Sequence, residues 1–186
     1  MSTTTKETGT QAWTIDPVHS QVDFGVRHMM ISTVRGTFGE LEGTIHLNED
    51  DVTDSSVEVT IDAASIDTRN EDRDGHLRSE DFFDVENHPH LTFNSTSVEE
   101  DGDGFLVTGD LTIRGETREV TLEARELGRG TDPWGNPRVG FSAETSVNRK
   151  DFGLTWNQAL ETGGVLVGDK IKISIEVQAI PADDDS

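Results

Sequence analysis

Alternation of apolar and polar residues recurs along most of this chain of 186 residues. Residues 56–63 read SVEVTIDA and residues 170–179 read KIKISIEVQA. Similar runs occupy residues 22–28, 105–113, 119–125 and 138–147. Because successive side chains of a strand point to opposite faces, this pattern predicts strands with one apolar and one polar face. Such strands are typical of antiparallel sheets.

The segments between these runs carry turn residues. EEDGDG at 99–104, RGET at 114–117 and DPWGNP at 132–137 are typical of hairpin loops. Glycines inside the run at 34–47 indicate bulges or sharp bends, which barrels need at their corners. The sequence therefore predicts an all-β sandwich or barrel of about eight strands.

Helical patterns are scarce, so we expect one or two short helices. Residues 70–83 are the best candidate, with Asn70 and Ser79 as predicted N-caps followed by acidic residues. The segment RHMMIS at 27–32 is a second candidate for one short turn.

The charge of the chain is strongly acidic, with a formal net charge of -22 and only four lysines. Such a surface repels nucleic acid and anionic membranes. Acids spread over the whole sequence, with few lysines, favour a halophilic protein whose self-repulsion is screened by salt. We therefore expect low ionic strength to destabilise it.

Compartment and cofactor follow from what the sequence lacks. There is no cysteine, which excludes disulfides and thiolate chemistry. The N-terminal residues MSTTTKETGT contain no apolar run, and no stretch reaches the roughly 18 apolar residues of a membrane span. We therefore expect a cytoplasmic protein without membrane insertion, without a metal and without a cofactor.

Catalytic patterns are weak. His88 and His90 form an H-x-H pair, but no recognisable metal-ligand spacing accompanies them. His19 and Ser20 are adjacent, so on a strand they would point to opposite faces. No catalytic residue is predicted. The periodicity alone leaves open whether the barrel is filled by side chains or encloses a ligand.

Four segments carry a family resemblance. They are residues 13–45, residues 68–96, GDLTIRGETREVTL at 109–122, and residues 140–177 from GFSAETSVNRKDFGLTWN to KIKISIEV. They resemble the YceI-like family. The resemblance implies an extended, lipocalin-like antiparallel β-barrel that encloses a polyisoprenoid, such as an isoprenoid quinone, for storage or transport without catalysis. The implied barrel spans residues 11–180, with a flexible tail at 1–10 and an acidic tail at 181–186. A homodimer is left open.

The resemblance supplies a lining rather than a motif, so we take inward apolar positions as candidate ligand contacts. These are Val22, Phe24, Val26, Phe38, Val57, Val59, Ile61, Phe93, Phe105, Val107, Leu111, Leu122, Phe141, Ile173 and Ile175. Met29, Met30, Ile31, Phe152, Leu154 and Trp156 are expected at the mouth, where methionine suits a plastic entrance.

Polar residues of the same segments are expected to hold the fold as ion pairs and caps. They are Asp16, His19, His28, Arg35, Asp72, Arg73, His76, Arg78 and Asp81. A second interpretation has His28 or Arg35 contacting a ligand headgroup. Two other functions stay open: an enzyme acting on a small apolar or quinone-like molecule through His19, His28 or His76, and a stress protein with a solid core that acts through its surface.

Overall fold

The computed structural model describes residues 10–29, 31–157 and 167–182. The strands are β1 (Thr10–Ile15), β2 (Gln21–His28), β3 (Ser32–Phe38), β4 (Leu41–Asn48), β5 (Ser56–Asp62), β6 (Ile66–Asp67), β7 (His90–Asp101), β8 (Gly104–Ile113), β9 (Glu116–Thr131), β10 (Pro137–Asn148) and β11 (Val167–Pro181). The described helix is α2 (Glu71–Arg78), and four 3-10 turns are η1 (Pro17–His19), η2 (Val52–Asp54), η3 (Ala63–Ser65) and η4 (Arg149–Phe152).

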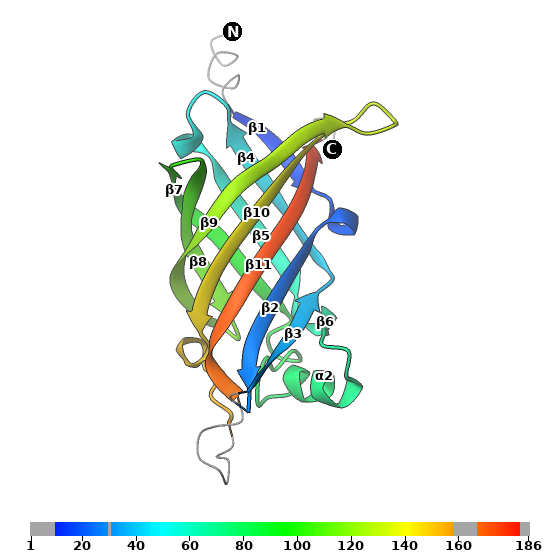
Figure 1. Cartoon of the computed structure of the whole chain (residues 1–186), viewed down its shortest axis with the longest axis vertical. Coiled ribbons are helices and arrows are strands. Elements are labelled where there is room, and N and C mark those ends of the chain that lie inside the picture. The colour runs from blue at the N-terminus through cyan, green and yellow to red at the C-terminus, as the bar shows by residue number, and fades with distance from the viewer. Residues whose placement is uncertain (1–9, 30, 158–166, 183–186) are drawn as a thin grey trace.

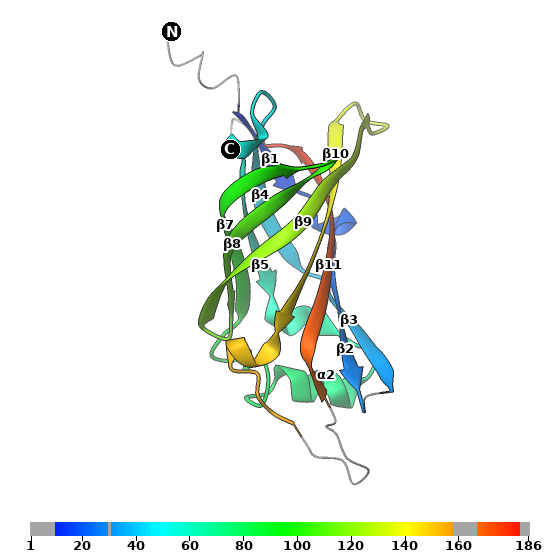
Figure 2. The ribbon, with the colours of Figure 1, turned by 60° about the vertical axis from the view of Figure 1, so that its left-hand side comes forward.

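Eight strands close into an antiparallel barrel in the order β1-β4-β5-β7-β8-β9-β10-β11, with β1 paired to β11. The expected lipocalin-like barrel is thus confirmed. Figure 1 shows an elongated barrel whose strands run obliquely along its axis, and Figure 2 shows the same barrel turned. We call the end where β1 begins and β11 ends the upper end. The opposite end, with α2 and the β2–β3 turn, is the lower end.

Strand β11 is long enough to hold two partners on one edge. Its residues Ala179–Pro181 pair with β1, and its residues 167–176 pair with β2. β1 and β2 therefore behave as one strand interrupted by η1. In the same way β3 and β4 are interrupted at Gly39 and Glu40, where the glycine run predicted a corner. The sheet extends from β2 through β3 to the short strand β6.

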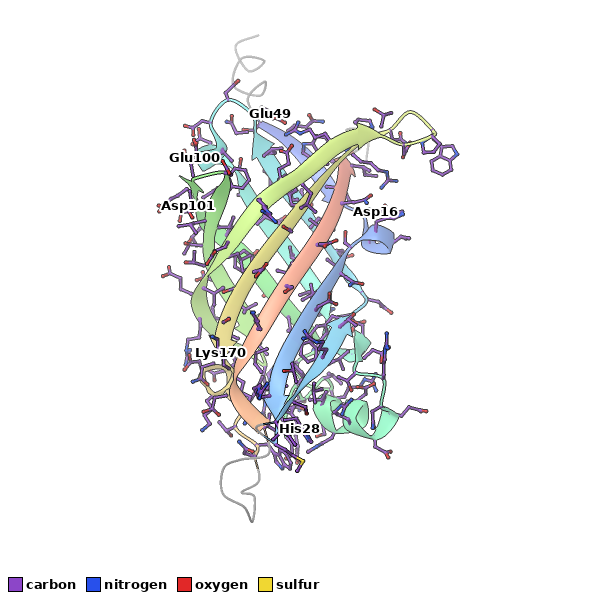
Figure 3. The ribbon with its side chains drawn as sticks, viewed as in Figure 1. Asp16, His28, Glu49, Glu100, Asp101 and Lys170 are labelled. Carbon is purple, nitrogen blue, oxygen red and sulfur yellow. The ribbon has the colours of Figure 1, made fainter. Side chains whose placement is uncertain are left out.

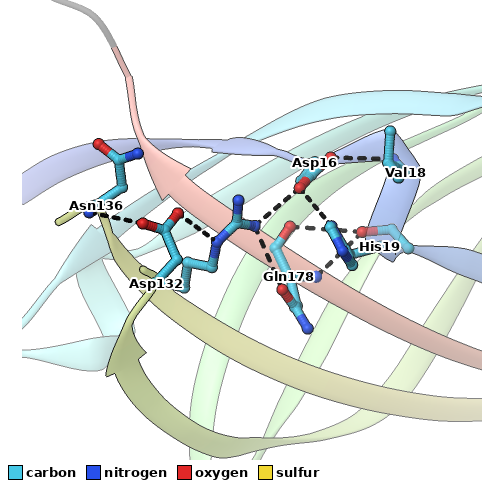
Figure 4. A network of polar contacts seen from close by, with 8 residues as sticks. Asp16, Val18, His19, Asp132, Asn136 and Gln178 are labelled. Atoms are coloured by element: carbon cyan, nitrogen blue, oxygen red, sulfur yellow. Dashed lines mark hydrogen bonds and ion pairs between the residues drawn. The ribbon is translucent and has the colours of Figure 1, made fainter. Parts of the chain in front are cut away.

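The interruption at η1 is held by polar contacts rather than by a strand ladder (Figure 4). The backbone nitrogen of Asp16 donates to the carbonyl of Gln178 in β11 at 2.8 Å. The backbone nitrogen of Gln178 donates to the hydroxyl of Ser20 at 3.1 Å. The Asp16 carboxylate also accepts from the backbone nitrogen of Val18 and from Nη1 of Arg138 at 2.8 Å. Arg138 lowers the pKa of Asp16 to about 2, with a smaller contribution from His19. Asp16 and His19 therefore build a strand break, as the fold-holding interpretation expected.

Asp16→Asn is expected to destabilise the fold by about 1–2 kcal/mol at neutral pH, because it removes the charge from these hydrogen bonds. A carboxyl group with a lowered pKa in the folded chain stabilises the fold above pH 3.8, and this stabilisation is lost as the pH falls towards 2. Denaturant unfolding between pH 2 and pH 7 should thus show a shallower acid dependence for the variant than for the wild type. Asp110→Asn, at an exposed position of β8, is the matched control. An unchanged acid profile in Asp16→Asn would contradict this role.

The predicted helix at 70–83 forms, but it is shorter. Asn70 is its N-cap, with its side chain accepting from the backbone nitrogen of Arg73 at 3.0 Å. The helix ends at Arg78, and Ser79 is its C-cap, so the prediction of Ser79 as an N-cap was wrong. The hydroxyl of Ser79 instead accepts from the backbone nitrogen of Asp81 and donates to the carbonyl of His76, because a Ser side chain satisfies turn groups as readily as helix starts.

The segment at 27–32 makes a hairpin turn between β2 and β3 rather than a helical turn. The backbone nitrogen of Ile31 donates to the carbonyl of His28, and Met29 adopts a φ of 55°. Strand pairing on both sides of this short connection overrides its apolar, helix-like composition. The three turns predicted from glycine and aspartate, at 99–104, 114–117 and 132–137, connect β7 to β8, β8 to β9 and β9 to β10.

The ends of the barrel agree closely with the sequence pattern. β1 begins at Thr10 and β11 ends at Pro181. The predicted tails, apart from Thr10, Pro181 and Ala182, lie outside the described residues. Within residues 10–29, 31–157 and 167–182, no helix has the length and apolarity that a membrane crossing requires.

Candidate ligand-binding cavity

A cavity of about 650 Å³ lies inside the barrel. Most of its wall is made of Val, Ile, Leu and Phe side chains that alternate inward along the strands. This volume lies within the ~300–1,000 Å³ that is usual for small-molecule sites, and such sites are mainly apolar. The barrel is therefore not solidly filled, which answers a question that the periodicity left open.

The cavity wall includes every inward apolar position taken as a candidate ligand contact: Val22, Phe24, Val26, Phe38, Val57, Val59, Ile61, Phe93, Phe105, Val107, Leu111, Leu122, Phe141, Ile173 and Ile175. Phe152, Leu154 and Trp156, expected at the mouth, line it as well. Period-2 reasoning places the inward positions because the face that is buried in a barrel is the inward one.

Two described residues expected at the mouth do not line this cavity. Met29 and Ile31 lie in the β2–β3 turn with 43% and 76% of their surface exposed, outside the lining. The turn between two paired strands extends beyond the end of the barrel, so side chains at its tip do not contact the cavity wall. Met30 lies outside the described residues.

A buried apolar cluster lies at the upper end of the cavity. Trp13, Leu47, Val139 and Ala179 form a second apolar cluster, separate from the main core. Only Leu47 of these four reaches the cavity, whereas Ala179 and Val139 are 0% and 1% exposed. The cavity therefore ends below this cluster on the side of β1, β10 and β11, whereas Val52, Ser55 and Ser56 line it near η2.

An ion-pair clamp reinforces the same end. Arg129 on β9 donates from Nη1 and Nη2 to Glu49, at 2.8 and 3.0 Å, and from Nε and Nη2 to Glu126. Glu49 follows β4, which lies four strands away from β9 in either direction around the ring. The clamp thus joins opposite sides of the barrel, and the two carboxylates raise the pKa of Arg129.

The lower end is different, because charged and histidine side chains, together with Asn70, enter the lining there. They come from β2, from the Asn70 cap with α2, and from η4: Arg27, His28, Asn70, Asp72, Arg73, His76 and Arg149. Figure 3 places His28 at this end. Of the two residues considered for a headgroup contact, His28 lines the cavity, whereas Arg35 is exposed and does not.

Residues of α2 anchor this polar rim. Asp74, 6% exposed, accepts at Oδ1 from the backbone nitrogen and the hydroxyl of Thr68, at 2.9 and 2.6 Å. Arg73 in turn donates from Nε to the Thr68 hydroxyl and from Nη2 to the Thr68 carbonyl. Arg78 donates to the carbonyls of Ala64 and Ile66. The buried carboxylate of Asp74 accepts two hydrogen bonds from Thr68, which follows β6. These bonds fix the helix against that segment.

A cluster of aromatic rings connects α2 with the segment after η4 at the lower end. The ring of His76 lies edge-on to Trp156, with centroids 4.6 Å apart, and to Phe82 at 5.1 Å. Nε2 of His76 faces Oδ2 of Asp81 at 2.9 Å. The geometry agrees with a packed and hydrogen-bonded histidine, as the fold-holding interpretation expected.

Arg149 is the central polar residue of the η4 side and was not predicted from the sequence. Its side chain is 2% exposed, and it donates to the carbonyls of Gly168, Leu154, Trp156 and Val167. Burial lowers its pKa, while Asp169 at 3.8 Å acts in the opposite direction. Arg149 therefore holds the segment after η4 against the start of β11.

Histidines and carboxylates do not gather into a metal-binding group anywhere in residues 10–29, 31–157 and 167–182. His88 packs against the turn between β8 and β9, where a Cβ on Gly115 would lie 3.0 Å from its ring. His90 begins β7 and is exposed.

The comparison with protein families agrees with this fold and cavity. The model of the YceI-like domain matches residues 13–179. The chain belongs to the YceI-like family. The matched region includes α2, six strands of the ring in full, and parts of β1 and β11.

Relatives and solved structures support the same assignment. Protein YceI of Escherichia coli is 46% identical over 136 residues, which are 73% of this chain and 71% of that protein. The structure of the Campylobacter jejuni YCEI protein has a TM-score of 0.71 at 31% identity and covers 84% of this chain and 90% of that one. A polyisoprenoid binding domain from Saccharophagus degradans has a TM-score of 0.67 at 14% identity, with 92% and 99% covered, and shows a shared fold.

Several lining residues were missed by the sequence interpretation. The apolar ones are Ile15, Val34, Leu41, Ile45, Leu47, Val52, Leu77, Phe82, Phe83, Leu91, Val98, Ile113, Val120, Ala124, Ala143, Val147, Val167, Ile171 and Val177. Many of them continue the same alternation and could have been included on that signal. The sequence signal for Arg149 was weaker. Arg149 starts a 3-10 turn that lies between the N-cap Asn148 and Gly153, whose φ is 79°.

Proposed function

We propose that this protein binds a long-chain isoprenoid, such as an isoprenoid quinone or a related polyisoprenoid, inside the barrel without transforming it. The observation that carries the proposal is the cavity: its wall is mainly apolar along the strands, and the charged and histidine side chains of the wall gather at the lower end. A hydrocarbon tail fits the apolar part, and a polar headgroup fits the rim.

Energetics favour a tail over a compact ligand. Each buried methylene contributes about 0.8 kcal/mol, so a chain ligand needs few polar contacts. Strand β10 has 12 residues, which span about 40 Å at strand geometry. The relation to the polyisoprenoid binding domain of Saccharophagus degradans supports this ligand class. A role in storage or transport in the cytoplasm of a halophile, with the acidic surface as adaptation to salt, completes the proposal.

A titration with quinones of increasing tail length tests the ligand class. Protein stripped of lipid by denaturation and refolding should retain a long-tailed isoprenoid quinone through gel filtration and release a quinone with the same ring and no tail. Affinity should rise by about a hundredfold or more with each fully buried isoprene unit until the cavity is full, because each unit buries about five further carbons.

The comparison between tails also tests the enzyme alternative. Equal retention of the tailless and long-tailed compounds would contradict binding through the hydrocarbon. Conversion of either compound into a product would support a catalytic function instead.

A further inference from the structure

Positive charge gathers on one outer face at the lower end of the barrel. Arg27 of β2, Arg35 of β3, and Lys170 and Lys172 of β11 are all exposed. Strand register places Lys172 opposite Gly25, and Gly25 opposite Arg35, so Lys172 and Arg35 share one row across three neighbouring strands. We call these four residues the basic face.

The basic face is an exception in this sequence. Residues 24–39 form the longest stretch without Asp or Glu in a chain that carries 37 acids. Lys150 of η4 also lies near the lower end, but it pairs with Asp169 at 3.5 Å. Among the described residues, Arg35, Lys170 and Lys172 have no ion pair. Figure 3 shows Lys170 and His28 at the lower end, whereas Glu49, Glu100 and Asp101 lie at the upper end.

An apolar tip lies beside the basic face. Met29 and Ile31 sit in the β2–β3 turn, and Ile31 is 76% exposed. The same hairpin contributes Val26, His28 and Val34 to the cavity wall. The exposed apolar tip is therefore continuous with the polar rim of the cavity.

We propose that the basic face and the β2–β3 tip dock this protein, lower end first, onto an anionic phospholipid bilayer. Lys170, Lys172, Arg27 and Arg35 contact the headgroups, and Ile31 and Met29 enter the interfacial layer. An isoprenoid passing between bilayer and cavity then crosses the rim without its tail entering water. This inference rests on the proposed function for its purpose, but the docking itself is a separate property.

The net charge of -22 does not prevent such docking. Charges separated by more than about 8 Å are largely screened at an ionic strength of about 0.15 M, and the screening length falls to about 3 Å in the molar salt of a halophile. Strand β11 has 15 residues, about 50 Å at strand geometry, so the acids of the upper end lie many screening lengths from a bilayer at the lower end. The result is reversible surface binding, in agreement with the expected lack of membrane insertion.

Vesicle sedimentation tests the docking. The probes are phosphatidylcholine vesicles with and without about one third phosphatidylglycerol, at about 0.15 M salt where screening lengths are ~8 Å. Wild-type protein should sediment with the anionic vesicles only. Lys170→Gln/Lys172→Gln should weaken this binding about tenfold or more, since each basic residue near an anionic surface contributes roughly a fivefold gain. Ile31→Ser should weaken it as well.

Matched controls separate docking from net charge. Arg125→Glu changes the net charge by as much as the double lysine variant, at an exposed site on β9 away from the basic face. Val18→Ser removes an equally exposed apolar side chain at η1. Both should bind vesicles like the wild type. Equal loss in Arg125→Glu, or no binding of wild-type protein to anionic vesicles, would overturn the proposal and leave an acidic protein as the partner to examine.

Organic extraction of the same variants measures their bound isoprenoid, and so distinguishes a failure of docking from a failure of the proposed function. The double lysine variant should carry as much bound isoprenoid as the wild type when folded, because neither lysine lines the cavity. Vesicle binding that persists in a protein without any isoprenoid would refute the proposed function and retain the docking.

Discussion

Arg149→Ala is expected to lower the free energy of unfolding by about 3–5 kcal/mol, which is a large part of the stability of a domain of this size. The side chain donates to four carbonyls of a buried segment, and alanine leaves those acceptors without partners. Denaturant unfolding followed by circular dichroism measures the loss. Arg149→Lys should recover only part of it, because an ammonium group cannot reproduce the planar fork of guanidinium.

Lys150→Ala is the control for Arg149. Lys150 is the next residue of η4, but its side chain is 50% exposed and its one ion pair reaches the same Asp169. Exposed ion pairs contribute about 0–1 kcal/mol, so this change should be nearly neutral. A similar small effect for Arg149→Ala would contradict the structural role that its contacts assign.

Ala143→Phe is expected to abolish isoprenoid binding while leaving the barrel folded. Ala143 lies in the middle of β10, is 9% exposed and lines the cavity between Ala124 and Ile175 of the neighbouring strands. A ring at this position enters the space that a tail would occupy. Because the ring fills a cavity rather than a packed core, stability should change by less than about 1–3 kcal/mol.

The neighbouring position supplies the control. Glu144 is exposed on the outer side of the same strand, so Glu144→Phe adds an aromatic ring outside the barrel. This variant should bind a long-tailed quinone like the wild type in gel filtration. Binding by Ala143→Phe that equals the wild type would show that the ligand lies elsewhere.

The sequence predicted the strands and the inward face with little error. Alternation determines which side chains of a strand share a face, so Phe105 and Val107, or Ile173 and Ile175, could be assigned to the interior before the structure was known. The eight-stranded ring followed from the number of alternating runs and from the family resemblance.

The remaining features depend on contacts between distant segments. The break between β1 and β2 is satisfied by Gln178, more than 150 residues away, so nothing local indicates it. Arg149 is buried because four carbonyls meet around it, although arginine is usually exposed. The apolar tip at Met29 and Ile31 was expected at the cavity mouth, but hairpin geometry directs it outward.

Mass spectrometry of the native protein's lipid content tests the central claim most directly. The protein would be purified in the salt of its own cells, denatured and extracted with organic solvent, with Ala143→Phe extracted in parallel. We predict close to one isoprenoid lipid per wild-type chain and little or none for Ala143→Phe. A wild-type extract without isoprenoid would contradict the account, and so would equal amounts from both proteins.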